Sequence, residues 1–208
     1  MTAVDLAYPF TGRWLVQNSP ADRVPSHGTS AFASSYAIDF VPLGEDSRTA
    51  PVRARTWVRP EPPVAFPGFG RRLLAPVDGV VLAASDAMPD HEAYRGLPSV
   101  VYAVTQGRRA AAGWGALAGN HVLMRTGAGV VVALCHLRGS SLVVRVGDRL
   151  RAGQPVGACG NSGNSTEPHV HVQAMDGPDP SRAGAVPITF GGSVPRSGRV
   201  VQAALPQP

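Results

Sequence analysis

Short runs of apolar residues, separated by turn-forming residues, make up most of this chain of 208 residues. Residues 36–41 (Tyr-Ala-Ile-Asp-Phe-Val) predict a strand with Ile38 and Phe40 on one face, because successive side chains of a strand point to opposite faces. Asp39 then lies on the other face. Further strands are predicted within residues 73–83, 120–125, 130–137, 142–159 and 185–190.

The composition favours the same kind of structure. Glycine contributes 24 residues and proline 20, which disfavours long helices and suits short strands joined by turns. Hydrophobic residues make up 44% of the chain and charged residues 16%, as in globular rather than disordered proteins. We therefore expect one all-β domain, built as an antiparallel β-sheet or sandwich.

The domain organisation follows from the irregular stretches. We expect the domain itself over residues 21–190, preceded by an N-terminal extension and followed by a loose tail, at 1–20 and 191–208. A proline- and arginine-rich region and a second irregular region are expected to be insertions, at about 42–72 and 85–118. A short helix is predicted near residues 90–95.

Charge and cysteine content exclude several classes of protein. All 19 basic residues are arginines spread along the chain, without a basic stripe interleaved with aromatic residues, so nucleic acid is not an expected partner. No apolar run is long enough to span a membrane, and no signal peptide is visible at the start. Cys135 and Cys159 are expected to be buried thiols rather than a bridge. We expect a monomer.

A His-x-His pair is the first candidate for chemistry. In His169-Val170-His171-Val172-Gln173 the residues alternate, so the two imidazoles share one face of a predicted strand. A turn-rich run over residues 160–168 precedes them. Such a pair makes half of a metal or acid–base site, although the motif alone is short and also fits two surface histidines.

Three other residues complete a possible site. They are His27 in a polar turn, Asp39 in its apolar strand, and His136 near the end of another strand. A buried carboxylate is costly unless it is paired or coordinates a metal. Zinc binds imidazole nitrogen and carboxylate oxygen, and a catalytic zinc uses three protein ligands. Three of these five residues would suffice as ligands, and the other two would handle protons.

Several blocks, in order and spacing together, resemble the lysostaphin/LytM-type zinc metallopeptidases (peptidase family M23), which cleave peptide bonds in bacterial cell walls. The resemblance runs from about Ser26 to Phe190 and implies an all-β fold of the LytM (barrel-sandwich-hybrid-like) type. Its blocks are the His27…Asp39 pair before Phe40-Val41, residues 75–81 (Ala-Pro-Val-Asp-Gly-Val-Val), residues 119–122 (Gly-Asn-His-Val), residues 134–137 (Leu-Cys-His-Leu), residues 146–148 with 152–154, and residues 160–166 before Pro168-His169-Val170-His171.

The resemblance also implies the roles of the site residues. One zinc ion (Zn2+) per chain would be held by His27, Asp39 and His171. His136 and His169 would be the catalytic histidines that do not bind the metal; they orient and deprotonate the attacking water and stabilise the oxyanion. The implied function is hydrolysis of peptidoglycan peptides, in the cell envelope or outside the cell.

Two positions depart from the family pattern. The family usually places its first histidine a few positions before the aspartate, whereas eleven residues separate His27 from Asp39 here. His121 is therefore the alternative third ligand. Glu167 stands where the family commonly has glycine, and an acid beside the catalytic strand is a candidate determinant of substrate choice.

Two other classes of function compete with an active peptidase. A catalytically inactive LytM-type module could bind the wall or regulate its hydrolysis, but all five functional positions are filled, which argues against it. A biotin- or lipoate-carrying domain shares the Gly-Asp turns, but it needs a lysine to carry the cofactor. The chain has no lysine, so this reading fails.

Overall fold

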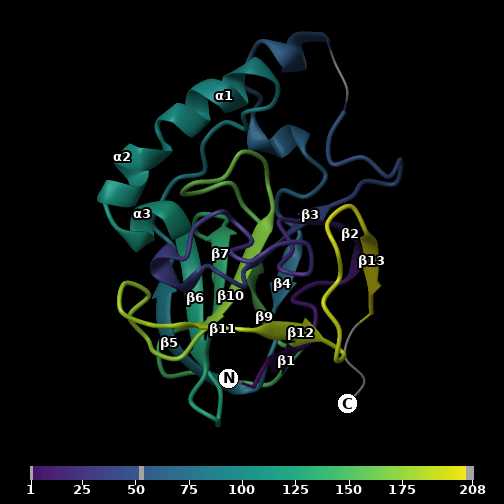
Figure 1. Cartoon of the computed structure of the whole chain (residues 1–208). Helices are drawn as coiled ribbons and strands as arrows, with labels where there is room; N and C mark the ends of the chain where they lie inside the picture. Colours follow the sequence, from purple (N-terminus) through teal and green to yellow (C-terminus); the bar gives the residue numbers. More distant parts are fainter. Residues whose placement is uncertain (1, 52–53, 205–208) are drawn as a thin grey trace.

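A large antiparallel sheet forms the body of the protein (Figure 1). The computed structural model describes residues 2–51 and 54–204. Within this part, the strand order is β13-β2-β3-β10-β7-β6-β5-β8, and β11 pairs with β10 beside this path. These strands are β2 (Gly12–Gln17), β3 (Ile38–Pro42), β5 (Gly79–Ser85), β6 (Asn120–Arg125), β7 (Val131–Leu137), β8 (Arg149–Leu150), β10 (Val170–Met175), β11 (Ala185–Val186) and β13 (Val200–Ala203).

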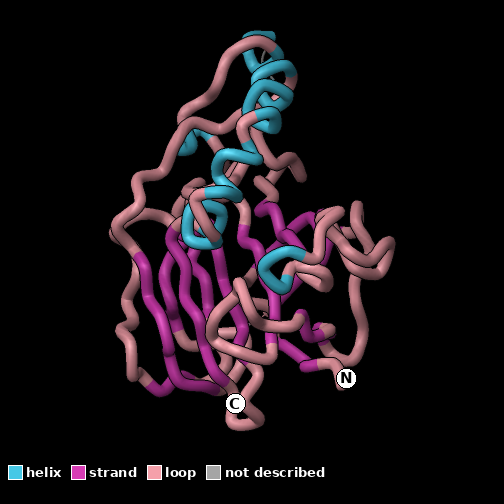
Figure 2. Tube along the Cα trace, turned by 60° about the vertical axis from the view of Figure 1, so that its left-hand side comes forward, coloured by secondary structure: helices cyan, strands magenta, loops and turns pink. Residues whose placement is uncertain are grey.

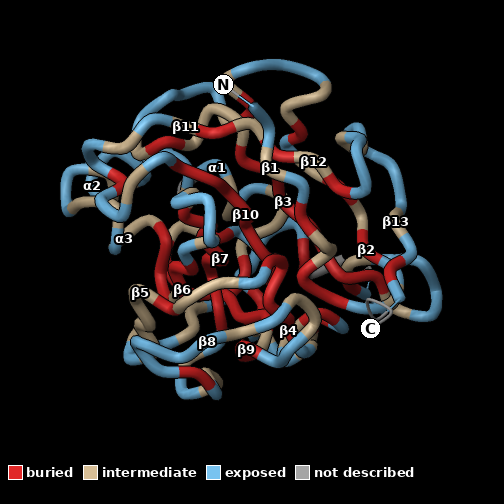
Figure 3. The backbone as a smooth tube through the Cα atoms, turned by 90° about the horizontal axis from the view of Figure 1, so that it is seen from below, coloured by how far each residue is buried: buried red, intermediate tan, exposed pale blue. Residues whose placement is uncertain are grey.

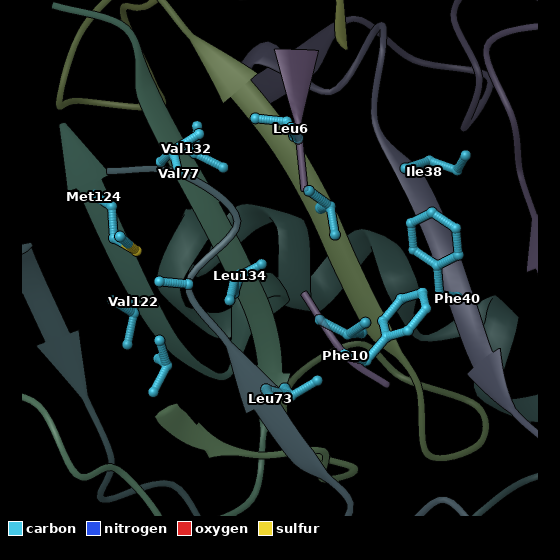
Figure 4. Close-up of a cluster of buried hydrophobic side chains, with 14 of the residues drawn as sticks. Leu6, Phe10, Ile38, Phe40, Leu73, Val77, Val122, Met124, Val132 and Leu134 are labelled. Carbon is cyan, nitrogen blue, oxygen red and sulfur yellow. The ribbon is translucent and has the colours of Figure 1, made fainter. Parts of the chain in front are cut away.

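Two small sheets cover one face of the large sheet. The strands β1 (Val4–Leu6) and β12 (Ile188–Phe190) pair in parallel, and β4 (Arg72–Leu74) pairs antiparallel with β9 (Pro155–Ala158). Leu6 and Leu73 from these small sheets belong to one buried cluster with side chains of the large sheet, as Figure 4 shows. The predicted all-β, single-domain fold is therefore confirmed.

The central strand β10 divides its side chains between two faces. Val170, Val172 and Ala174 lie in the main hydrophobic cluster, because every second side chain of a strand points the same way. His171 and Gln173 are buried on the opposite face. Seen from below, the buried residues follow β10 and the strands on either side of it, β3 and β7 (Figure 3). The polar side chains of β10 thus lie in the middle of the sheet, where they are shielded from solvent.

Three short helices lie beyond one end of the large sheet (Figure 2). They are α1 (Leu97–Val104), α2 (Gln106–Ala111) and α3 (Trp114–Ala118). The helix predicted near residues 90–95 is wrong, because Ala93 instead forms a β-bridge with Glu61 in the first insertion. Three 3-10 turns complete the helical structure: η1 (Ala31–Ala33), η2 (Ala54–Trp57) and η3 (Pro63–Ala65).

The two ends of the chain contribute strands to the sheets. Residues 1–20, expected as an extension, contain β1 and β2, whose buried Trp14 and Val16 join the main core. Residues 200–203 lie in the predicted loose tail but form β13, which pairs with β2 at the edge of the sheet. The boundaries proposed for the peptidase-like unit, 21–190 with its two insertions, stay a prediction.

Two smaller expectations can also be compared with the structure. Both cysteines are buried and unbridged, as predicted. Among the described residues, the helices are all too short or too polar to cross a membrane.

Candidate metal and catalytic site

Asp39 is the centre of a polar cluster on the face of the sheet opposite the main core. The residue is 5% exposed. The atom Oδ2 lies 3.0 Å from His27 Nε2 and accepts a hydrogen bond of 2.7 Å from the Asn18 amide. The atom Oδ1 lies 2.9 Å from His171 Nδ1 and 3.8 Å from His169 Nε2. Four of the five predicted site residues therefore meet around one carboxylate.

The pairing of strands explains how two of these residues meet. His171 of β10 stands directly opposite Asp39 of β3 in the antiparallel register. Cross-strand partners in this arrangement have Cβ atoms about 4.5–5.5 Å apart, so the two side chains reach each other without distortion. His27 comes from the loop before η1, and the Ser26 hydroxyl lies 3.0 Å from its Nδ1. Its Nε2 therefore points to the carboxylate.

The donor atoms have the chemistry and spacing of a metal site. His27, Asp39 and His171 each offer one ligand atom, and these atoms lie within 4.8 Å of one another. In a tetrahedral zinc site with bonds of about 2.0–2.2 Å, two ligand atoms are separated by about 3.4 Å. Two imidazole nitrogens and a carboxylate oxygen are a known type of zinc ligand set. The three residues therefore fit a zinc ion.

Gln173 determines which nitrogen of His171 faces this cluster. Its Oε1 lies 3.0 Å from His171 Nε2, while its own amide donates a hydrogen bond of 2.9 Å to the carbonyl of Phe32. Because the amide is thus fixed, Oε1 accepts the proton on Nε2. With Nε2 held by Gln173, Nδ1 faces Asp39 Oδ1 and is the nitrogen that can bind a metal when it carries no proton, an orienting contact typical of metal-binding histidines.

The charges within the cluster stabilise one another. Burial alone would raise the pKa of Asp39, but the nearby charges of His27 and His169, with hydrogen bonds from His171 and His27, hold that pKa well below its usual value. Burial likewise would lower the pKa of His27, but the Asp39 carboxylate raises it overall. The aspartate thus stabilises a proton on His27.

His136 reaches the site through an irregularity in β7. Val132 and Leu134 point into the main core, so regular alternation would send His136 there as well. However, His136 has a positive φ of 63°, and the register with β6 shifts at this point. Such a bulge re-aims a side chain. His136 therefore lies on the Asp39 face, and Leu137 takes the core position.

Two histidines in the site have hydrogen bonds that leave one nitrogen open. His136 Nδ1 lies 2.9 Å from the carbonyl of Ser162, and His169 Nδ1 lies 2.8 Å from the carbonyl of Glu167. A carbonyl only accepts, so each Nδ1 carries a proton, and neither Nε2 takes part in these bonds. The two rings are 4.6 Å apart. Burial, with the neighbouring charges of His169 and His171, holds the pKa of His136 well below its usual range, so it is neutral at neutral pH.

An open cleft of about 540 Å³ gives access to the cluster. Its walls include the predicted site residues together with Trp114 and Gln106 of the helical region. His121, the alternative ligand, lies elsewhere: its ring packs on Trp114 at 4.5 Å, and its Nδ1 lies 2.7 Å from the carbonyl of Gly119. Thus the structure brings His27, and not His121, to Asp39.

Sequence reasoning missed several residues that support the site. Gln173 shares the strand face of His169 and His171, so the alternation over these residues could have identified it. Asn18, which binds Asp39 Oδ2, gives no such signal, because it approaches from β2 through a long-range pairing. The helix with Trp114, which lines the cleft, was also not predicted, because its sequence is rich in glycine.

The chain shares sequence similarity with a peptidase family and with two curated endopeptidases. Residues 89–182 match the family model described as Peptidase family M23. The chain is 32% identical over 90 residues to the Glycyl-glycine endopeptidase ALE-1 of Staphylococcus capitis, covering 43% of this chain and 25% of that protein. It is 33% identical over 79 residues to the Peptidoglycan DD-endopeptidase ShyA of Vibrio cholerae, covering 38% of this chain and 18% of that protein.

Among solved structures, the catalytic domain of lysostaphin from Staphylococcus simulans aligns with 72% of this chain and 74% of its own, with 20% identity and a TM-score of 0.41. The predicted resemblance to lysostaphin/LytM-type peptidases of family M23 is confirmed by the family match. The match includes His136, His169 and His171 but begins after His27 and Asp39. The matched regions make up a quarter or less of the two curated relatives.

Proposed function

We propose that this protein is a zinc-dependent endopeptidase that hydrolyses peptide bonds of bacterial peptidoglycan. The observation that carries the proposal is the grouping of His27, Asp39 and His171 around a buried carboxylate, at the base of an open cleft. The similarity to a glycyl-glycine endopeptidase and to a peptidoglycan DD-endopeptidase supports the substrate class. These relatives also favour a place of action in the cell envelope.

In this proposal, His27 Nε2, an Asp39 oxygen and His171 Nδ1 hold one zinc ion. A zinc ion bound there would polarise the substrate carbonyl and make water a nucleophile at neutral pH. Asn18 and Gln173 keep the aspartate and His171 in position through their hydrogen bonds. His121 has no part in the metal site.

His136 and His169 transfer protons in this proposal. Since His136 is neutral at neutral pH and its Nε2 is unprotonated, it accepts a proton from the attacking water. His169 Nε2 lies at the edge of the cluster, 3.8 Å from Asp39 Oδ1. From there His169 donates to the oxyanion. The proton taken by His136 then returns to the leaving amine.

Zinc content of purified variants tests the metal site. We expect about one zinc per chain in the parent and little in His171→Ala and His27→Ala, because each change removes a ligand. His121→Ala is the matched control and should keep its zinc. If His121→Ala lost the metal while His27→Ala retained it, the assignment of the third ligand would be wrong.

Digestion of purified peptidoglycan tests the activity. The parent should release new amino termini from the wall, and chelation of zinc should stop the release. An inactive wall-binding module would instead sediment with the wall and release nothing, even after loading with zinc. That result would contradict the proposed activity and favour the alternative.

A further inference from the structure

Glu167 lies in the wall of the cleft, two residues before His169. Its main-chain carbonyl accepts two hydrogen bonds at the site, from His169 Nδ1 at 2.8 Å and from the Ser165 hydroxyl at 2.7 Å. These bonds fix the backbone on both sides of the residue. The side chain is thereby anchored at a defined point of the cleft, beside a proposed catalytic histidine.

The carboxyl group of Glu167 lacks a cationic partner among the described residues. Its Oε2 is shielded from solvent and has no hydrogen-bond partner. The nearby guanidinium of Arg95 is bound instead to Glu61, with Nη2 2.6 Å and Nε 2.9 Å from Glu61 Oε2. The neutral side chains of Thr49 and Gln17 lie beside the carboxyl, and the charges of His169 and Arg95 act on it without forming an ion pair and do not outweigh its burial. Burial accordingly raises its pKa.

A buried carboxylate without a cation is unfavourable, and an added donor relieves this cost most when the donor is charged. The terminal torsion of a glutamate is soft, so Oε2 can turn toward the cleft without strain. A substrate that brings an ammonium group would complete the missing pair. A neutral amide N–H would relieve less of the cost, because it carries no charge.

We propose that Glu167 is a specificity-determining residue that binds a primary ammonium group of the peptide substrate. This inference rests on the proposed function, because it assigns the substrate class of the same cleft. The substrate is then a peptide with a free amine near the scissile bond, as on a diamino acid or at a peptide amino terminus. Glu167 touches the substrate and takes no part in bond cleavage.

Binding of defined peptides tests this proposal separately from hydrolysis. The probes are N-acetylated tripeptide amides with lysine either before or after a Gly-Gly pair, each with a free or an acetylated ε-amine. Titration is performed on the zinc-loaded His136→Ala variant, so that the peptides survive the measurement. The same background then carries Glu167→Gln, which keeps the shape and removes the charge, or Glu92→Gln, an exposed acid outside the cleft wall.

We expect the free amine to bind about tenfold more tightly than its acetylated form in at least one series. Glu167→Gln should reduce this ratio to within about twofold, whereas Glu92→Gln should leave it unchanged. Equal binding of both forms by the Glu167 protein would overturn the inference, and so would a preference that survives in Glu167→Gln. Failure of the parent to cleave any peptide would count against the proposed function alone, because the binding ratio does not depend on turnover.

Discussion

At the scale of single residues, the site buries polar side chains on strands that are otherwise apolar. Asp39 interrupts an apolar strand, and its position was predictable because a buried acid demands partners. His27 and His171 were named from the sequence as its partners. Gln173 could have been identified from the alternation of its strand, but Asn18 could not be assigned from the sequence, since its contact depends on which strands lie side by side.

Glu167 should reduce the stability of the protein at neutral pH. Its pKa is raised by burial, so the protonated form is favoured in the folded state, and its contribution to stability is lost as the pH rises above the usual value of 4.5. In zinc-free protein at pH 7.5, Glu167→Gln should raise the free energy of unfolding by about 1 kcal/mol. At pH 4 the gain should vanish.

Urea denaturation at the two pH values measures this difference. Glu92→Gln is the matched control and should change the free energy of unfolding at neither pH, since Glu92 is exposed. A Glu167→Gln variant less stable than the parent at pH 7.5 would mean that the carboxylate is well partnered in the folded protein.

At the scale of elements, the sequence predicted the strands that carry the site better than the details within them. The alternation in residues 36–41 and 169–173 predicted β3 and β10, and the apolar run in residues 130–137 predicted β7. Each of these strands sends alternate side chains into the main core. The bulge in β7 could not be predicted, because the sequence of hydrophobic residues does not indicate the positive φ of His136. The short helices were missed because their sequence is rich in glycine and lacks a long apolar period.

The positive φ at the bulge predicts how substitutions of His136 change the stability of the protein. Asparagine tolerates a positive φ, whereas the β-branched valine does not. His136→Val should therefore be less stable than His136→Asn by about 1–2 kcal/mol, as measured by chemical denaturation. His136→Asn should keep its zinc and lose at least a hundredfold in the rate of peptide hydrolysis, because the proton acceptor is gone. Equal stability of the two variants would show that the backbone relaxes at this point.

At the scale of the whole molecule, the site joins distant parts of the chain. His27 precedes β3, the strand of Asp39, and His136 lies one residue before the end of β7. His171 lies in β10, between β3 and β7. The fold class was predictable from the sequence, and the five candidate site residues, with His27 preferred to His121, were named from it. The path of the loop that carries His27 was not predictable, since that loop is placed only by the packed sheet.

Zinc should bind more weakly as the pH falls. The Asp39 carboxylate raises the pKa of His27, so a proton competes with the metal for Nε2 and must leave when zinc binds. Competition with a chelator should show the zinc affinity rising from pH 6 to pH 8. A free zinc concentration of 100 times Kd should add about 2.7 kcal/mol of stability, which thermal unfolding detects. His171→Ala should show neither effect, and a pH-independent affinity in the parent would contradict the pairing of His27 with Asp39.

The position of β10 has a consequence for when the proposed metal site can form. This strand lies in the middle of the sheet between β3 and β7, yet it is among the later segments to be synthesised. Until it inserts, β3 and β7 are not joined, and Asp39 has no His171 opposite it. A nascent chain therefore has only part of the proposed ligand set. On this view the protein cannot cut peptides inside the cell that makes it before its own folding is complete.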